Sequence, residues 1–442
     1  TTGWPQKGGV YRWVGEAFGK KWGFLAIWLQ WIESTIWFPT VLTFAAVSLA
    51  FMGPGQRWDE ALAANKWYVL IVVLCVYWAA TLLNLRGMKT SAGVTKWGTI
   101  IGTIVPGAIL ILLGLGYWAG GNPILLDMSW DKLVPDMSNF NNLVLAASIF
   151  LFYAGMEMSA VHVKDVDNPG RNYPLAILIS AIITVLIFVL GTLAIGFIIP
   201  NSQINLVQSL LITYDSYFSF FGLGWMNWIL ALALAVGVLA QVTAWVGGPS
   251  KGLYQVGLAG NLPPVMQKRN KNNVQMGILL IQGGIVTLLS IMFVIMPSVQ
   301  SAYQIISQLT IILYLIMYML MFASGIYLRY REPNTPRTFR IPGGRTFGMW
   351  VVGGLGLLAS LAAFLVSFIP PNQITVGSST MYVLLLVVGT FIFAGIPFII
   401  HAMAKPSWKR PVDPEDAFEP FGWEKSNGSH SAATPSHSIS HE

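Results

Sequence analysis

Ten long apolar runs divide this sequence, and they constrain its fold more than any other feature. A helix needs about 20 apolar residues to cross a bilayer, and a backbone in hydrocarbon must satisfy its own hydrogen bonds. Only 10% of the residues are charged, against about 25% in a soluble domain. The alternating ten-residue segments of a membrane barrel are absent. We therefore predict an all-α integral membrane protein, with spans at about 22–52, 66–86, 97–119, 143–163, 175–200, 225–250, 274–297, 303–328, 348–369 and 380–404.

The basic residues are distributed unevenly between the two sides that these spans define. Of 25 Lys and Arg, 22 fall in segments on one side, and only Arg57, Lys66 and Lys132 fall on the other. Cytoplasmic loops carry the excess of positive charge, so we predict a multi-pass plasma-membrane protein with both ends of this chain cytoplasmic. The net charge of +7 follows from this topology and implies no nucleic-acid partner. The expected neighbours are membrane lipids.

The composition of the segments outside the spans predicts where each of them lies. Residues 1–21 mix basic and aromatic side chains, as in a helix that lies at the membrane interface. Residues 201–224 are polar and aromatic and predict a short surface helix. We expect residues 1–404 to form one transmembrane domain. Residues 405–442 are rich in Pro, Ser and charge, and predict a disordered cytoplasmic tail.

One span, 143–163, contains a glycine and an acid near its middle. A charged residue at the centre of a membrane helix costs about 2.5–3.5 kcal/mol on insertion scales, so an intramembrane acid indicates a functional site. Gly155, two residues before Glu157, allows the helix to open. In the alternative interpretation, Gly155 is a close-packing contact and Glu157 is paired with a buried donor.

Other polar and aromatic residues within the spans recur at helical spacing. Gln241 and Trp245 are four apart and share one helix face, and Tyr314 and Tyr318 repeat this spacing. These residues suit a cavity for a small zwitterionic or polar solute. Helix packing and interhelical hydrogen bonds are the alternative. Glu33 is a second acid in the apolar region, either in a structural hydrogen bond or as a proton site.

The sequence offers little to support covalent or metal chemistry. Cys75 is the only cysteine, and three of the five histidines lie in the tail. No nucleophile has a neighbouring base, which argues against an enzyme. No metal and no cofactor are implied.

Several segments resemble the amino acid–polyamine–organocation transporter superfamily, and most closely its bacterial glutamate/γ-aminobutyrate antiporters. They are GGVYRWVGEAFG, KKWGFLAIWLQW, FYAGMEMSAVHVKDVDNPGRNYPLA, AWVGGPSKGLYQVGLAGNLPP and RTFRIPGG. The resemblance implies a LeuT-like fold of two five-helix inverted repeats plus two helices. This chain aligns with ten of the usual twelve helices and lacks the first two. The resemblance also implies exchange of a glutamate-like amino acid for γ-aminobutyrate by alternating access.

The resemblance assigns roles to individual residues. Gly155 and Met156 would expose backbone groups to the substrate at the helix break, and Glu157 would couple or gate transport. The remaining positions that match substrate-binding or gating residues of the family are Leu151, Trp245, Tyr314 and Tyr318. Gln241 stands where the antiporters have an acid, and Glu33 replaces a neutral residue.

Two other functions remain open from the sequence. The first is a proton-coupled amino acid symporter of the same fold, in which Glu33 or Glu157 carries the proton. The second is a membrane receptor or scaffold that binds without transporting. The oligomeric state is open, and a homodimer is one candidate.

Overall fold

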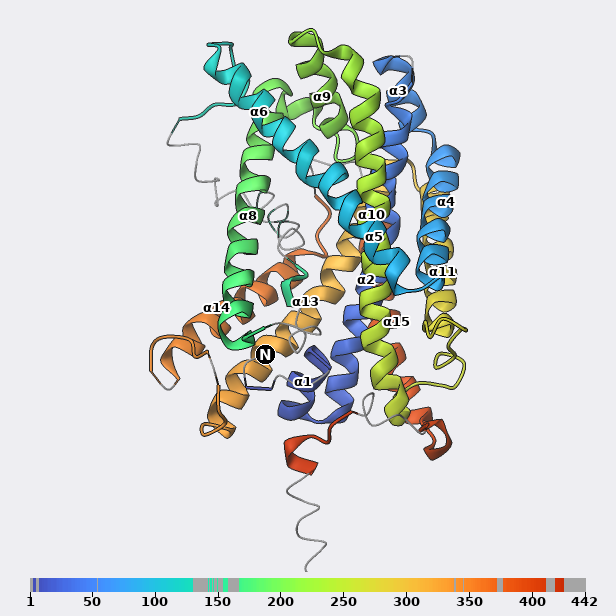
Figure 1. Cartoon of the computed structure of the whole chain (residues 1–442), viewed down its shortest axis with the longest axis vertical. Helices are drawn as coiled ribbons and strands as arrows, with labels where there is room; N and C mark the ends of the chain where they lie inside the picture. The colour runs from blue at the N-terminus through green and yellow to red at the C-terminus, as the bar shows by residue number, and fades with distance from the viewer. Residues whose placement is uncertain are drawn as a thin grey trace, which may run out of the picture.

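Helices form all of the regular structure that the computed structural model describes (Figure 1). It describes residues 3–4, 8–53, 55–129, 142, 144, 146, 149, 154–157, 167–337, 339–344, 346–371, 377–410 and 418–424, without the side chains of 56, 88–92, 169 and 170. The α-helices are α1 Val10–Phe18, α2 Lys20–Ala50, α3 Gln56–Ala63, α4 Lys66–Leu85, α5 Met88–Thr99, α6 Val105–Ala119, α8 Pro169–Ile198, α9 Ser209–Phe220, α10 Asn227–Val256, α11 Met276–Ser290, α12 Met292–Ile295, α13 Val299–Arg331, α14 Phe347–Val366 and α15 Ser379–Met403.

The apolar runs become membrane-length helices. Nine helical segments of the described chain are long and apolar enough to cross a membrane, and they confirm nine of the ten predicted spans. The tenth, 143–163, falls mostly outside the described residues. The short helix predicted within 201–224 is confirmed as α9. In Figure 1, α3 and α9 lie at the upper end of the bundle and α1 lies at the lower end.

Helix α2 lies at the centre of the bundle and packs against α1, α4, α10 and α13. Its apolar side chains surround the helix, so it is buried along most of its length. A buried polar chain fixes it to its neighbours: Trp31 Nε1 donates to Gln282 Oε1 at 2.7 Å, and Gln282 Nε2 donates to the Tyr77 hydroxyl at 3.1 Å. Because buried polar groups need partners, these three residues set the register of α2, α4 and α11.

The segment formed by α5, a π-helical turn at Ile100–Ile104 and α6 packs directly against α10. Gly102 and Gly237 bring the two backbones together, since a Cβ on Gly102 would lie 2.2 Å from the Gly237 Cα. A Cβ on Gly98 would similarly lie 2.3 Å from the Ala240 Cβ. Small residues permit this close backbone approach between membrane helices.

Residues 418–424 pack on α1, and we call this assembly the terminal clasp (α1 with residues 418–424). The ring of Phe421 is 1% exposed and lies on Gly15, where a Cβ would be 2.5 Å from the ring. Trp423 stacks on Phe421 with centroids 5.4 Å apart, and its Nε1 donates to the Gly15 carbonyl at 3.1 Å. Aromatic burial thus gives this part of the chain a defined position, an exception to the disordered tail predicted for 405–442.

Charged groups complete the terminal clasp. Arg12 is 2% exposed and donates to the carbonyl oxygens of Glu419 at 2.6 Å and Pro420 at 3.1 Å. It also pairs with Glu16 at 3.0 Å, and the Glu16 carboxylate accepts from the Gly422 N–H. We predicted that residues 1–21 lie at the membrane interface, but the guanidinium of Arg12 is instead enclosed by residues 418–424. It can be buried there because main-chain carbonyls and Glu16 replace part of its hydration.

Replacing Phe421 with alanine should release this segment from α1. Removing a buried phenylalanine ring costs about 3–5 kcal/mol in protein cores, so we expect the Gly422 amide hydrogen to exchange about tenfold faster or more. Hydrogen exchange with mass spectrometry measures this change. Phe391→Ala, at a side chain that is 76% exposed, is the control. Unchanged exchange in Phe421→Ala would contradict the clasp.

The clasp should also weaken at acid pH. Burial tends to raise the pKa of Glu424, but hydrogen bonds from Lys20 and the Phe421 N–H, with nearby positive charge, outweigh it and lower the pKa. A lowered pKa stabilises the docked segment above the released value, about 4.3, and this contribution disappears as pH falls through the docked pKa. Gly422 protection, corrected for intrinsic exchange rates, should therefore fall below about pH 4. A Glu424→Gln variant should lose this part of the pH dependence, and an identical profile in both chains would exclude Glu424 as its source.

Candidate functional site

The backbone at Gly155 is not α-helical. Its φ is +103°, a left-handed conformation that glycine adopts without steric penalty. A turn at 154–155 and a 3₁₀-type turn at 156–157 occupy this position, which confirms the predicted opening of the helix. The indole of Trp245 lies against the break, since a Cβ on Gly155 would be 2.9 Å from its Cη2. Glycine is therefore required here by conformation and by space.

Glu157, two residues beyond the break, is hydrogen-bonded by neutral side chains from two helices. Tyr318 of α13 donates its hydroxyl to Oε2 at 2.9 Å, and Tyr314 donates to Oε1. Gln30 of α2 approaches Oε1 with its Nε2 at 3.4 Å. The carboxyl group is half-buried, so it keeps access to the space around it. These donors can hold a carboxylate inside an apolar bundle without a formal counter-charge.

Tyr318 also binds the break itself. The Gly155 N–H donates to the Tyr318 hydroxyl at 3.3 Å, so one hydroxyl joins the opened backbone to the carboxylate. The rings of Tyr314 and Tyr318 stack with centroids 4.7 Å apart. Their i, i+4 spacing near the middle of α13 places both side chains on one face of the helix, about one turn apart.

Trp245 forms an aromatic wall beside the break. Its ring packs against Trp37 of α2 with centroids 5.6 Å apart. Trp245 is only half-buried, so part of the indole remains accessible. The structure therefore brings Gly155, Glu157 and Trp245 together with the tyrosine pair, as the sequence predicted. Trp37 was missed, because the number of aromatic residues in 22–52 concealed it.

Glu33 occupies a different position from Glu157. It is 3% exposed, and its Oε1 has no hydrogen-bond partner in the described part of the chain. It lies close enough to Glu157 for the two carboxyl groups to interact electrostatically. Gln30 rather than Glu33 donates to Glu157. The i, i+3 spacing of Gln30 and Glu33 places both on one helix face, and this was the sequence signal that could have identified Gln30 as a neighbour of Glu157.

The remaining predicted residues have less to do with this cluster. Gln241 has an exposed side chain, although Trp245 shares its helix. Met156 is half-buried and lines a cavity together with Glu157. Leu151 lies outside the described residues.

A cavity of about 650 Å³ connects Glu157 with one end of the bundle. Its walls are apolar side chains of α8, α13 and α14, such as Ile177, Phe322 and Met349. Arg329, in the last turn of α13, and Arg337, in the connection that follows, line the other end of this cavity. The cavity is large enough for a small organic solute and leads from the basic end of the bundle to the broken helix.

Together, a broken helix, an intramembrane carboxylate and a solute-sized cavity have the form of a membrane transporter site. Sequence comparison identifies the family of transporters to which the chain belongs. A model of the amino acid permease family matches residues 1–393. The chain therefore belongs to the amino acid permease family, and it is an amino acid transporter and not an enzyme.

Individual relatives agree with this assignment. An uncharacterized transporter of Legionella pneumophila is 38% identical over 90% of this chain and 84% of its own length. A glutamate/γ-aminobutyrate antiporter of Lactococcus lactis subsp. lactis is 32% identical over 91% of this chain and 79% of its own length. A protein of the same name from L. lactis subsp. cremoris matches equally, at 32% identity over the same shares.

Tyr318→Phe should weaken amino acid uptake. It removes the hydrogen bond to Glu157 and the acceptor for the Gly155 N–H. Because hydrogen bonds to charged groups contribute about 1.5–3 kcal/mol, we expect uptake to fall about tenfold or more. Uptake by reconstituted vesicles measures this effect.

The matched control is Tyr68→Phe, which removes a tyrosine hydrogen bond to the Ala46 carbonyl on the other side of α2. It should leave uptake near the unmodified level. Equal uptake in both variants would show that the Tyr318 hydroxyl does not support the site.

Proposed function

We propose that this chain is an antiporter that exchanges a glutamate-like amino acid for γ-aminobutyrate by alternating access. The observation that carries the proposal is the Glu157 carboxylate, held at the Gly155 break by Tyr314 and Tyr318. The name shared by the two Lactococcus relatives supports the choice of substrates.

Both proposed substrates contain an ammonium group and a carboxylate, and the site offers a counterpart to each. Glu157 is the acceptor for the ammonium group, and the indole of Trp245 beside it adds a cation–π surface. The opened backbone at Gly155 and Met156 is proposed to contact the substrate carboxylate, as backbone groups of discontinuous helices do, with the Gly155 N–H exchanging its Tyr318 acceptor for the substrate. Leu151 and Gln241 are proposed to adjust access and charge preference around this site.

The surroundings are assigned in the same proposal. Residues 1–404 would form the transporter domain, in which one helical bundle of the LeuT-like 5+5 arrangement moves against a scaffold. Both ends of the chain would be cytoplasmic, so the cavity at Arg329 and Arg337 would open inward. Membrane lipids would cover α8, α14 and α15, which expose many large apolar side chains. A homodimer is the proposed oligomer to be tested.

Counterflow into proteoliposomes tests the exchange. Vesicles loaded with γ-aminobutyrate should take up labelled glutamate about tenfold faster than empty vesicles if entry depends on exit. Glu157→Gln removes the charge that the ammonium group needs, and Trp245→Ala removes the aromatic wall. Each should reduce exchange by about tenfold or more, because each removes a direct substrate contact.

Glu332→Gln and Trp67→Ala are the matched controls, since both side chains are exposed and neither lines the cavity that contains Glu157. Both should exchange at the unmodified rate. Full exchange by Glu157→Gln would refute the role of the carboxylate. Equal uptake by loaded and empty vesicles would refute antiport.

Proton-coupled symport of an amino acid is the second candidate function, and Glu33 is the observation that favours it. A buried carboxyl group beside a second one, with an oxygen that has no partner among the described residues, is a reasonable proton carrier. Under this mechanism, empty vesicles with an imposed pH gradient take up the amino acid, and Glu33→Gln abolishes the response. Uptake that requires an internal amino acid and ignores the gradient supports antiport.

A further inference from the structure

A second pocket lies at the end of the bundle opposite the arginine-lined cavity. It has a volume of about 310 Å³ and lies where the end of α2, helix α3, helix α9 and the start of α10 meet. Figure 1 places α3 and α9 at this upper end, away from α1. The proposed exchange mechanism does not use this pocket, since Glu157 and Trp245 lie elsewhere.

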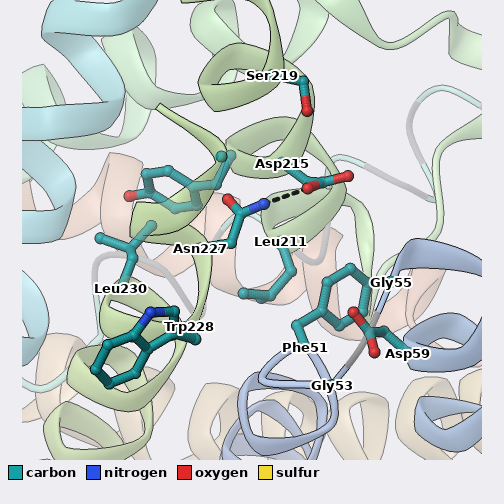
Figure 2. Close-up of a pocket in the computed structure, with 12 residues that line it drawn as sticks. Phe51, Gly53, Gly55, Asp59, Leu211, Asp215, Ser219, Asn227, Trp228 and Leu230 are labelled. Carbon is teal, nitrogen blue, oxygen red and sulfur yellow. Dashed lines mark hydrogen bonds between the residues drawn. The ribbon is translucent and has the colours of Figure 1, made fainter. Parts of the chain in front are cut away.

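Two aspartates line this pocket from different helices. Asp59 of α3 is 5% exposed, and its Oδ1 is buried without a hydrogen-bond partner in the part of the chain described. Asp215 of α9 accepts a hydrogen bond from Asn227 Nδ2 of α10. Figure 2 shows this pair joined across the pocket, with the Asp59 carboxyl group beside the ring of Phe51. The Oδ1 of Asn227 is also buried and unpartnered within the described residues.

These oxygens form an acceptor set without an internal cation. The described residues contain no ion pair to Asp59 or Asp215. The two carboxyl groups are close enough to interact electrostatically. A buried carboxylate with an open acceptor is unfavourable unless a donor or a positive charge reaches it. A positive charge bound in the pocket would therefore stabilise these carboxylates, as in a cation site.

The pocket walls narrow the choice of cation. Tyr214 and Trp228 contribute aromatic surface next to the acidic groups, and Phe51 lies beside Asp59. Aromatic faces and carboxylates together suit organic ammonium groups. A divalent metal requires six or more oxygen ligands in a compact shell, or a cluster of acids. No group of three His, Cys, Asp or Glu side chains that could hold a metal occurs among the described residues.

We propose that this pocket binds the primary ammonium group of a small organic amine, with Asp59, Asp215 and the Asn227 Oδ1 as acceptors. The volume of about 310 Å³ exceeds the requirement of a single water or ion and accommodates a short alkyl chain. The ammonium group supplies the hydrogen-bond donors that Asp59 Oδ1 and Asn227 Oδ1 lack among the described residues. The alkyl chain contacts the aromatic walls.

The pH dependence of binding follows from the same groups. Burial raises the pKa of Asp59 against a backbone hydrogen bond from Gly55, and the charges of Asp215 and Glu60 add to the increase. Burial also raises the pKa of Asp215, against the hydrogen bond from Asn227, and Glu60 again adds to it. The acceptors are neutralised as pH falls through these raised values. Amine affinity should therefore decline at a higher pH than an exposed aspartate, with a pKa of about 3.9, would require.

The test is calorimetric titration of the full chain in lipid nanodiscs with n-butylammonium chloride. The titration uses a Glu157→Gln background, so that the central carboxylate does not contribute. We expect a saturable site, and Asp59→Asn and Asp215→Asn should each weaken it about tenfold or more because each removes a charged acceptor. Asp127→Asn, which removes an exposed acid outside the pocket, is the matched control.

Further measurements keep the proposal falsifiable if an aspartate variant fails to fold. Ser219→Trp fills the pocket from an exposed position and leaves both acids in place, so it should also abolish binding. Sodium butyrate, which has the same chain length but no ammonium group, should not bind. Unchanged butylammonium affinity in Asp59→Asn or Ser219→Trp would overturn the proposal. Tighter binding of Ca²⁺ or Na⁺ to the same acids, with displacement of the amine, would do the same and would indicate an inorganic cation site.

Discussion

A carboxylate within an apolar bundle has to be hydrogen-bonded from every side that water does not reach, and this requirement organises the centre of the molecule. Glu157 meets it with hydroxyl donors from α13 and an amide from α2. The chain can deliver the carboxylate to those donors only because the backbone opens at Gly155, where φ is positive. Three separate stretches of sequence are therefore tied to one functional group. A change in its charge or position affects all of them together.

Neutral donors at this carboxylate have a chemical consequence. A lysine or arginine partner would neutralise Glu157 and compete with an incoming ammonium group. Tyrosine hydroxyls and an amide hold the carboxylate in place and leave its negative charge available. Under the proposed function, a solute with a positive group would provide a counter-charge, and the indole of Trp245 lies beside the Gly155 break. Substrate selection by charge would then depend on residues that are themselves uncharged.

Much of this arrangement could be predicted from the sequence, and the limits have physical causes. Apolar length fixed the spans, and the Gly155 and Glu157 pair pointed to the break, because both signals are local. Whether Gln30 or Glu33 reached Glu157 depended on the rotation of α2, which packing decides.

The other contacts that were not predicted join distant parts of the chain. Composition favoured disorder for the tail, and Phe421 is buried through contacts with distant residues of α1 such as Gly15 and Tyr11. Asp59 and Asp215 are far apart in sequence, so no motif could connect them. The contact of Gly102 with Gly237 is of the same kind, and it has a mechanical consequence. Two main chains that touch without side chains between them have no rotamers through which to yield, so α10 and the segment from α5 to α6 would translate and tilt as one stiff body. A conformational change would then be accommodated at other helix contacts, where long side chains can change rotamer.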